Sequence, residues 1–308
     1  MILYQDTGRL CNRLVSASYC LAFALEHDLT FINLCFWRYQ GLYEPIGAWR
    51  HPWLHRTRYL TSSLLEQVLE LKVCAPIRAR FVYDERLIVD PMLICRRIGS
   101  ALLSRFLCEG MRVPALGLQV RNEKAWDHHC HLLVEERASN FPVFSTEILL
   151  KHQTQVKAVF QPMARHSDAV NCLMTSLRGR YDRLVGVHIR REDYCRYNTG
   201  KWMLSIKDYA QAMHHIAEEF VGDKVGFVIA SSSPLVLSEF DGLSVCSAPG
   251  HLLEDNIALS RCDMIVGPPS TYSGWASFSG NVPIRFIEAN NLLPSRHEFT
   301  ESWVPRFY

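Results

Sequence analysis

The 308-residue sequence lacks the features that mark several large classes of protein. It contains no CxxC pair, no GxGxxG turn and no Walker loop, so the usual glycine-rich phosphate loops are excluded. It has little excess charge, +2 in total, which argues against a nucleic-acid partner. Internal repeats and low-complexity stretches are missing as well. With 48% hydrophobic and 21% charged residues, the chain is globular rather than disordered, collagenous or coiled-coil.

Long apolar runs and paired cysteines are also missing. The first apolar block, residues 14–25, is too short to cross a bilayer, and no basic segment precedes the opening MILY. The 11 cysteines stand singly on apolar segments, as at Cys20 and Cys262, which is typical of small buried residues in a reducing compartment. We therefore expect a cytoplasmic protein without a transmembrane segment, for which a peripheral membrane contact stays open.

The chain opens with a βαβ pattern. Residues 1–4 predict a strand, a helical period runs over about 12–26, and residues 30–34 predict a second strand. An aromatic-rich stretch over 35–60 then predicts a long loop or a few short helices. A mostly helical pattern follows over 64–180, with strand candidates at 80–83 and 117–121.

The C-terminal part of the chain alternates strands and helices. Apolar runs predict strands over 184–189, 225–230, 243–246, 263–266 and 283–287. Helical segments are expected over 206–220, 234–240, 252–261 and 270–278. Such an alternation predicts a doubly wound α/β domain, with a parallel sheet covered on both faces and ligands beyond the carboxyl ends of its strands. We expect two domains, residues 1–180 and 181–308.

The sharpest functional segment is VHIRREDY, residues 187–194, which follows a predicted strand. In an extended strand, His188 and Arg190 point to one side and Arg191 to the other. Arginine presents a planar fork of donors that suits phosphate oxygens, and a neighbouring carboxylate such as Asp193 can brace it. The segment therefore indicates a phosphate-binding strand end, and a solvated charged loop is the alternative.

Two further segments bring polar groups to helix starts. The segment TGRLCNR lies where the first strand turns into a helix, and its Asn12 either approaches an anion or caps the helix. Residues 254–273 predict a helix, a buried strand, a Gly-Pro-Pro turn and a second helix. Ser270 and Thr271, at the start of that second helix, suit a phosphate, and Asp255 suits a base or ribose edge. Ordinary capping and a surface acid are the plainer alternatives.

Together and in this order, the three segments resemble the fucosyltransferase superfamily that includes α-1,2- and α-1,6-fucosyltransferases and protein O-fucosyltransferases. That family carries a G-R-L/F-G-N-Q loop, an H-x-R-R-x-D motif after a strand, and a late D…L-S…D-x-x-(I/V)…S-T/S-x-S stretch. The corresponding residues here read GRLCNRL (8–14), HIRREDY (188–194) and DNIALSRCDMIVGPPSTYS (255–273). The resemblance covers the first 34 residues and about 183–290.

The resemblance implies a GT-B type fold, in which two Rossmann-like domains face a cleft. Residues 1–180 would form the acceptor side, and residues 181–308 the domain that binds the nucleotide-sugar donor. It also implies an inverting transferase that moves fucose from GDP-fucose to a hydroxyl of a carbohydrate acceptor, with no metal and no other cofactor.

The same resemblance assigns a role to each matched residue. By this resemblance His188 would contact the nucleotide, Arg190 and Arg191 would contact the pyrophosphate, and Asp193 would brace one of these arginines. Asp255 would bind the guanosine end of the donor, and Ser270 and Thr271 would bind its phosphates. Asn12 would reach the donor from the N-terminal domain, and Tyr209, by a weaker match, would contact the donor.

The chain has no DxD pair, with which many nucleotide-sugar enzymes hold a divalent ion on the pyrophosphate. Charge on the departing diphosphate must then be stabilised by Arg190, Arg191 and helix N-termini. The acceptor hydroxyl also needs a base, and Glu192, Asp193 and Asp6 are candidates.

Several positions depart from the family pattern. Cys11 and Arg13 replace Gly and Gln, Glu192 replaces Gly or Thr, and residues 230–234 lack the acidic or amide pair common after that strand. Another nucleotide-activated sugar therefore stays open as the donor, and a glycan- or nucleotide-binding module without turnover is the alternative of another class. The run WDHHCH at 126–131 holds metal-ligand residue types, but consecutive residues cannot all face one ion, so no metal is expected there.

Overall fold

The computed structural model describes residues 2–5, 9–27, 32–33, 39, 42–44, 133–135, 145–190 and 200–305. The chain divides into two compact units, residues 1–161 and 162–308. The sequence placed the division at 180/181, after a helix that the structure assigns to the second unit. Among the helices of these described ranges, none combines the length and the apolar character that crossing a membrane requires.

The first unit begins with a small parallel sheet in the order β2-β1-β3. Its strands are β1 (Ile2–Gln5), β2 (Ile32–Asn33) and β3 (Leu133–Glu135). Helix α1 (Leu10–Glu26) connects β1 to its parallel neighbour β2, so the predicted βαβ start is confirmed. β3 falls where the sequence shows a mostly helical pattern, because three residues are too few to establish a strand period.

Most of the predicted middle region lies outside the described residues. This holds for the strand candidates at 80–83 and 117–121, for the run WDHHCH at 126–131, and for all of the aromatic stretch except residues 39 and 42–44. The structure does not test these predictions, and they stay predictions.

Helix α1 is almost wholly buried, and α6 (Thr146–Lys151) and α7 (Gln153–Val159) pack against it. Near its C-terminal end, Glu26 accepts hydrogen bonds from Lys151 Nζ at 2.8 Å and from His152 Nε2 at 2.7 Å. The bond from Lys151, followed by the bond from His152, lowers the pKa of the Glu26 carboxyl. The buried apolar side chains of α1 therefore fix its packing, and the polar cluster of Glu26, Lys151 and His152 joins its end to α6.

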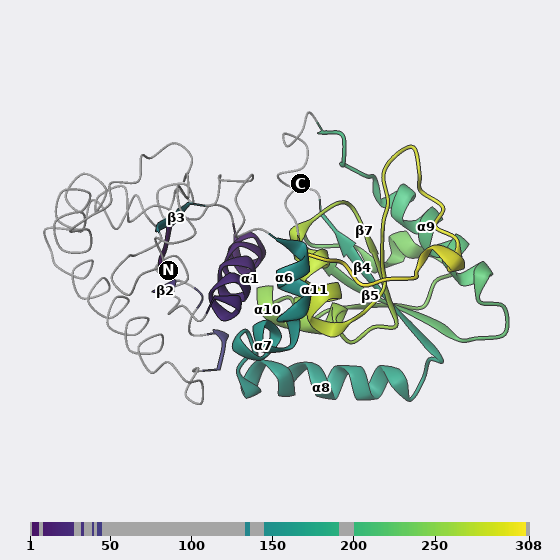
Figure 1. Ribbon diagram of the computed structural model, residues 1–308. Helices are drawn as coiled ribbons and strands as arrows, with labels where there is room; N and C mark the ends of the chain where they lie inside the picture. Colours follow the sequence, from purple (N-terminus) through teal and green to yellow (C-terminus); the bar gives the residue numbers. More distant parts are fainter. Residues whose placement is uncertain are drawn as a thin grey trace, which may run out of the picture. The chain divides into compact units, whose positions relative to one another are not determined.

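The second unit is built on a five-stranded parallel sheet in the order β6-β5-β4-β7-β8. The three central strands of this sheet, β5, β4 and β7, are labelled in Figure 1. The strands are β4 (Arg183–Ile189), β5 (Val225–Ser231), β6 (Val245–Ser247), β7 (Met264–Gly267) and β8 (Ile284–Phe286). All five predicted strands of this region are therefore confirmed. The chain moves from β4 outward through β5 and β6, then returns to the other side of β4 for β7 and β8. The strand order thus reverses between β4 and β7, which is where open α/β sheets bind ligands.

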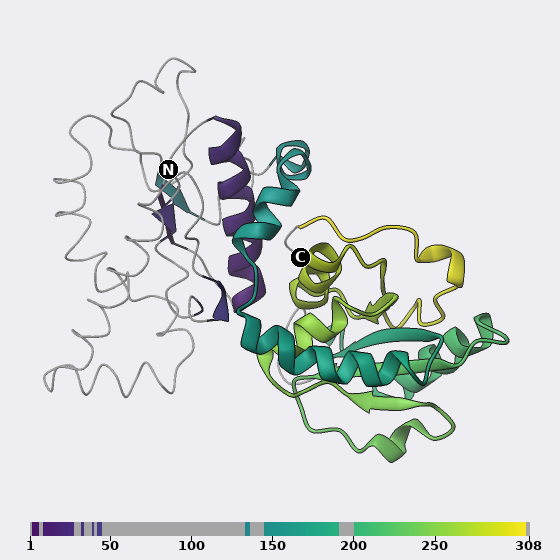
Figure 2. The same cartoon turned by 90° about the horizontal axis from the view of Figure 1, so that it is seen from below.

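Helices cover both faces of this sheet (Figures 1 and 2). They are α8 (Ala164–Arg178), α9 (Ile206–Glu219), α10 (Leu252–Leu259) and α11 (Thr271–Gly280). A helix expected over 234–240 is only the short 3-10 turn η6 (Leu237–Phe240), and a second such turn, η7 (Arg296–Glu298), lies near the C-terminus. Val236, the residue before η6, has an extended backbone (φ −94°, ψ 106°), so the helical turn starts only at Leu237.

The two faces are packed by alternate residues of the central strand. Val187 and Ile189 point into an apolar cluster that also holds Met213 of α9. Gly186 faces the other side, where an added Cβ would lie 2.8 Å from Leu259 Cδ2 of α10. Glycine at this position therefore lets α10 approach the sheet closely, and the burial of six consecutive residues in β4 follows from having helices on both sides.

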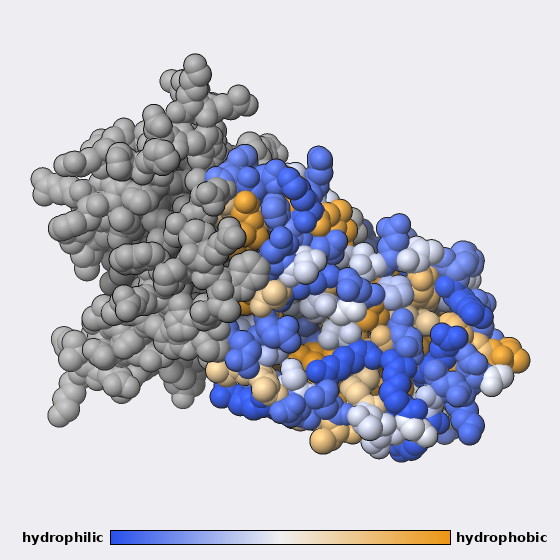
Figure 3. Space-filling view, turned by 60° about the horizontal axis from the view of Figure 1, so that its bottom comes forward, coloured by the Kyte–Doolittle hydropathy of each residue, from blue (hydrophilic) through white to orange (hydrophobic). Residues whose placement is uncertain are grey.

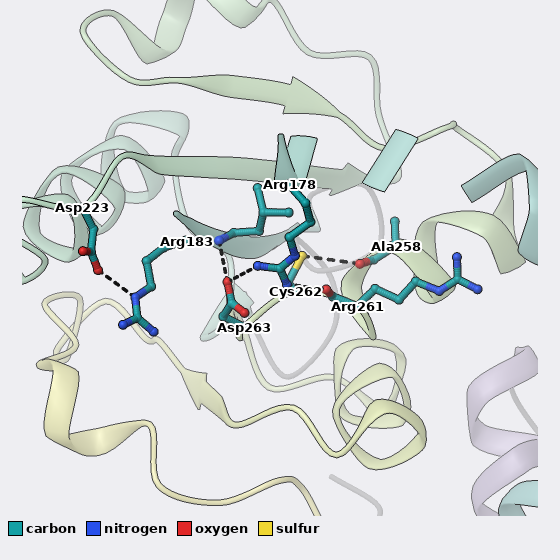
Figure 4. A network of polar contacts seen from close by, with 8 residues as sticks. Arg178, Arg183, Asp223, Ala258, Arg261, Cys262 and Asp263 are labelled. Carbon is teal, nitrogen blue, oxygen red and sulfur yellow. Dashed lines mark hydrogen bonds and ion pairs between the residues drawn. The ribbon is translucent and has the colours of Figure 1, made fainter. Parts of the chain in front are cut away.

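Ion pairs hold the amino ends of the strands (Figure 4). Asp263, just before β7, accepts from Arg178 Nη1 at 2.6 Å and from the backbone N–H of Leu184 in β4 at 2.7 Å. Arg183 Nε donates to Asp223 Oδ2 at 2.8 Å, ahead of β5. These contacts align β4, β5 and β7 at the end of the sheet opposite to the expected ligand site.

Five cysteines lie among the described residues, and none of them is bonded to another described cysteine. Cys11, Cys20 and Cys262 are buried, and burial raises the pKa of the Cys262 thiol. Cys172 is exposed on α8, so the expectation of buried cysteines is wrong at this position: it lies on the polar face of an amphipathic helix. In the view of Figure 3 the described surface is mostly hydrophilic, with apolar side chains in small separate groups.

Candidate functional site

The carboxyl end of β4 places two of the predicted residues beside the start of α11. His188 is 4% exposed, and its Nδ1 lies 3.2 Å from the Ser273 hydroxyl. Two residues further on, the half-buried Arg190 donates from Nη1 to the Ser270 hydroxyl at 3.3 Å. The alternation of side chains along a strand predicts that His188 and Arg190 point to the same side, and both do contact the first turn of α11.

The first turn of α11 begins at a serine that caps the helix. Ser270 is its N-cap, and the Ser270 hydroxyl accepts from the backbone N–H of Tyr272 at 3.2 Å. Thr271 follows as the first helical residue, so both predicted hydroxyls lie at a helix N-terminus. The positive end of the helix dipole and the Arg190 guanidinium thus meet at one place, which favours an anion.

Close contact between β4 and β7 fixes the position of His188. A Cβ added at Gly267 would lie 2.8 Å from the carbonyl oxygen of His188 and 3.0 Å from its Cβ. The His188 ring also lies 5.0 Å from the Tyr272 ring. Glycine at the end of β7 therefore allows the two strand ends to converge at the point where the strand order reverses.

Helix α10 is tied to this region by polar contacts. Asn256 Nδ2 donates to the backbone carbonyl of Tyr272 at 2.7 Å, and Tyr272 Oη donates to the carbonyl of Leu252 at 2.8 Å. The buried Asp255 accepts from the backbone N–H of Gly250 at 2.6 Å, and burial raises the pKa of this carboxyl. Asp255, predicted as a nucleotide contact, therefore also holds the turn before α10.

The remaining predicted residues fall in other places. Tyr209 is fully buried in the apolar cluster beneath α9, because it shares a helical face with Met213, so its nucleotide contact stays a prediction. Asn12 lies in the first turn of α1, whose N-cap is Arg9. The alternative prediction that Asn12 caps this helix is therefore wrong. The residues that follow Arg190, namely Arg191, Glu192 and Asp193, lie outside the described residues, as does Asp6.

Sequence reasoning missed the residues that connect the site. Asn256, Tyr272 and Ser273 join α10, α11 and β4, although each stands next to or within a motif that was recognised. Ser273 lies three positions after Ser270, a spacing that places two side chains on one helical face, and this is the signal that could have identified it. The two-residue spacing of Tyr272 carries no such signal.

The chain thus has an α/β fold in which Arg190 and the N-terminus of α11 form a polar site that favours an anion, at the point where the strand order of the parallel sheet reverses. No protein-family model and no curated protein matches the chain by sequence.

The fold is similar to that of solved fucosyltransferases. Fucosyltransferase NodZ from Bradyrhizobium superposes with a TM-score of 0.53 at 14% identity, over 92% of this chain and 93% of that one. NodZ α-1,6-fucosyltransferase co-crystallised with GDP gives 0.53 at 13% identity, over 93% and 94%. A mutant of Arabidopsis thaliana FUT1 in complex with GDP gives 0.50 at 12% identity, over 95% and 74%. The predicted α/β fold class is thereby confirmed, and the chain has a fold similar to that of these solved fucosyltransferases.

Proposed function

We propose that this chain is a glycosyltransferase that moves a sugar from a GDP-sugar, with fucose as the sugar, to a hydroxyl of a carbohydrate acceptor. The observation that carries the proposal is the contact of Arg190 with Ser270 at the N-terminus of α11, at the switch point of the sheet. The fold supports it, because the similar NodZ and FUT1 structures were solved with GDP.

The diphosphate of the donor would lie against the N-terminus of α11. In this proposal Arg190 binds its oxygens directly, while the hydroxyls of Ser270 and Thr271 and backbone N–H groups of the first turn of α11 bind the remainder. Arg191, which follows on the chain, supplies a second guanidinium. Each well-placed donor of this kind contributes about 3 kcal/mol to stabilising the departing charge.

The proposed transfer inverts the anomeric carbon and uses no metal ion at the diphosphate, since arginine and the helix N-terminus supply the positive charge. A carboxylate removes the proton from the acceptor hydroxyl as the new bond forms, and Glu192, Asp193 and Asp6 are the candidates. His188 contacts the nucleotide and is held by Ser273 and Tyr272.

The base of the nucleotide would lie towards α10. One carboxylate oxygen of Asp255 accepts a hydrogen bond from the backbone N–H of Gly250, in the turn before α10. Helix α10 in turn packs against α11. After β5, the Ser231 hydroxyl accepts from the backbone N–H of Ser233 at 3.2 Å, so this segment forms a tight polar turn rather than presenting an acidic pair. Another nucleotide-activated sugar is the competing possibility that this serine-rich turn permits.

Titration calorimetry of the full chain in EDTA tests the proposal. GDP should bind, UDP and dTDP should bind more weakly, and GDP-fucose should be hydrolysed slowly without an acceptor. Failure to bind GDP would remove the proposed function. Binding of GDP without hydrolysis or transfer, across a screen of GDP-sugars and oligosaccharide acceptors, would leave a binding module of the same fold.

A further inference from the structure

A second polar cluster of the same unit has no part in the proposed transfer. It consists of His166 in the first turn of α8, and of His251 and Glu254 at the N-cap and in the first turn of α10. One potential metal-ligand atom from each residue lies within 4.8 Å of the other two. All three side chains belong to the residues 162–308 unit, so the cluster is formed by this unit alone.

The distances in the cluster suit a small cation. Glu254 Oε1 lies 2.8 Å from His166 Nδ1 and 3.9 Å from His251 Nδ1. Neighbouring ligands of a tetrahedral zinc ion, with bonds of about 2.05 Å, are about 3.3 Å apart. The observed separations lie on either side of that value, so the three side chains are near enough to share one ion once their rings are reoriented.

The environment also favours a transition-metal ion. The side chains of His166 and Glu254 are only 10% and 18% exposed, whereas that of His251 is 44% exposed. Two imidazoles and one carboxylate are a ligand set that zinc accepts, while magnesium and calcium prefer oxygen ligands only. The exposed side of His251 leaves room for water as a fourth ligand.

We propose that His166, His251 and Glu254 bind a zinc ion that links the first turns of α8 and α10, separately from the diphosphate site. Arg165 Nε donates to His166 Nε2 at 3.3 Å, so the proton of His166 resides on Nδ1 and faces Glu254. Zinc takes the place of that proton, which moves to Nε2 as the exposed Arg165 side chain turns away. The carboxylate of Glu254 then neutralises one of the two positive charges of the ion.

Coordination also requires His251 to turn. A histidine nitrogen binds a metal in the plane of its ring, but the rings of His166 and His251 are stacked, with planes only 8° apart. His251 is the more exposed of the two, and rotating it breaks the stack and the 3.3 Å hydrogen bond that its Nδ1 accepts from the backbone N–H of Leu253. Zinc binding therefore replaces the N-cap of α10 with a metal link.

Calorimetry and thermal melting of the full chain with ZnCl₂ test this site. After EDTA treatment and its removal, the wild-type protein should bind zinc and its Tm should rise, whereas MgCl₂ should leave the Tm unchanged. His251→Ala removes an exposed ligand and should weaken zinc binding by at least about tenfold. Glu254→Gln, which keeps the size of the side chain but loses its charge, should do the same.

His214→Ala, on the exposed face of α9, is the matched control and should bind zinc like the wild type. If His251→Ala and Glu254→Gln bind zinc with wild-type affinity and stoichiometry, the ion lies elsewhere and the proposal fails. Absence of zinc binding to the wild-type chain would overturn it as well. GDP titrations in EDTA are independent of this result, so either proposal can fail without the other.

Discussion

The two ends of the C-terminal sheet are both polar, but they use charge differently. At the amino ends, Asp263 meets Arg178 and Asp223 meets Arg183, so opposite charges compensate each other within the protein. At the carboxyl ends, Arg190 meets a hydroxyl at the positive end of α11, so two sources of positive potential converge. The first arrangement is complete without a ligand, whereas the second becomes more favourable when an anion binds.

Replacing Arg190 is the change expected to have the largest effect. Arg190→Ala removes a donor to the diphosphate, and turnover of the GDP-sugar should fall by about 10²–10³-fold, which corresponds to about 3–4 kcal/mol in the barrier. The half-buried side chain donates to the Ser270 hydroxyl and is not part of the apolar cluster, so the Tm should stay near that of the wild type. Initial rates with a saturating acceptor and parallel thermal melts measure both effects.

Arg178→Ala, at the opposite end of the sheet, is the matched control for Arg190→Ala. It should leave GDP binding intact and lower the Tm instead, because its bonds to Asp263 and to the Arg261 carbonyl are lost. Near-normal rates for Arg190→Ala, or a larger loss of rate for Arg178→Ala, would contradict the comparison between the two ends.

Asp263→Ala should give the largest loss of stability at the amino ends. Asp263 Oδ2 accepts from a guanidinium and from the partly buried backbone N–H of Leu184. Losing charge-assisted bonds of this kind should lower the free energy of unfolding by about 2 kcal/mol. Urea denaturation measures the change, and GDP affinity should be unaffected.

Asp223→Ala is the variant with which the stability loss of Asp263→Ala is compared. Its ion pair with Arg183 is exposed on both sides, so its removal should cost at most about 1 kcal/mol. Equal effects of the two substitutions would mean that the backbone contact of Asp263 adds nothing.

Ser270→Ala probes the carboxyl end at the helix cap. It removes the N-cap of α11 and the hydroxyl that Arg190 contacts, and should lower the free energy of unfolding by about 1 kcal/mol. GDP affinity should fall about tenfold, since the guanidinium loses its support. Ser270→Thr keeps the hydroxyl and should recover most of both losses; a tenfold loss of affinity in this variant would point to steric rather than hydrogen-bonding effects.

The second sheet was predictable because its strands are continuously apolar runs separated by amphipathic helices. The pairing of His188 and Arg190 on one side followed from the strand period. The contacts of Asn256 and Tyr272 did not follow, since they join helices that are adjacent only after the chain has returned across β4. The same holds for His166 and Glu254, which are 88 residues apart in the chain. β3, with three residues, was too short to leave a period in the sequence.

Asp255 offers the smallest and most specific test, because its effects on stability and on binding should oppose each other. Burial raises the pKa of this carboxyl above its ordinary value of 3.8, so the folded protein favours the protonated form. The ionised carboxylate therefore costs stability, and this cost is absent well below pH 3.8 and grows as the pH rises through the raised pKa. Asp255→Asn can keep an oxygen acceptor for the Gly250 N–H without the buried charge.

At pH 7 the Asp255→Asn variant should unfold at a slightly higher urea concentration than the wild type, and this advantage should shrink as the pH falls towards 4. Its affinity for GDP should nevertheless drop, because the carboxylate is the proposed contact for the guanosine end. A variant that is less stable than the wild type at pH 7 would show that the bond to Gly250 outweighs the cost of burial. If the GDP affinity is unchanged, Asp255 only stabilises the turn before α10, and the base must be bound elsewhere at the carboxyl ends of the strands.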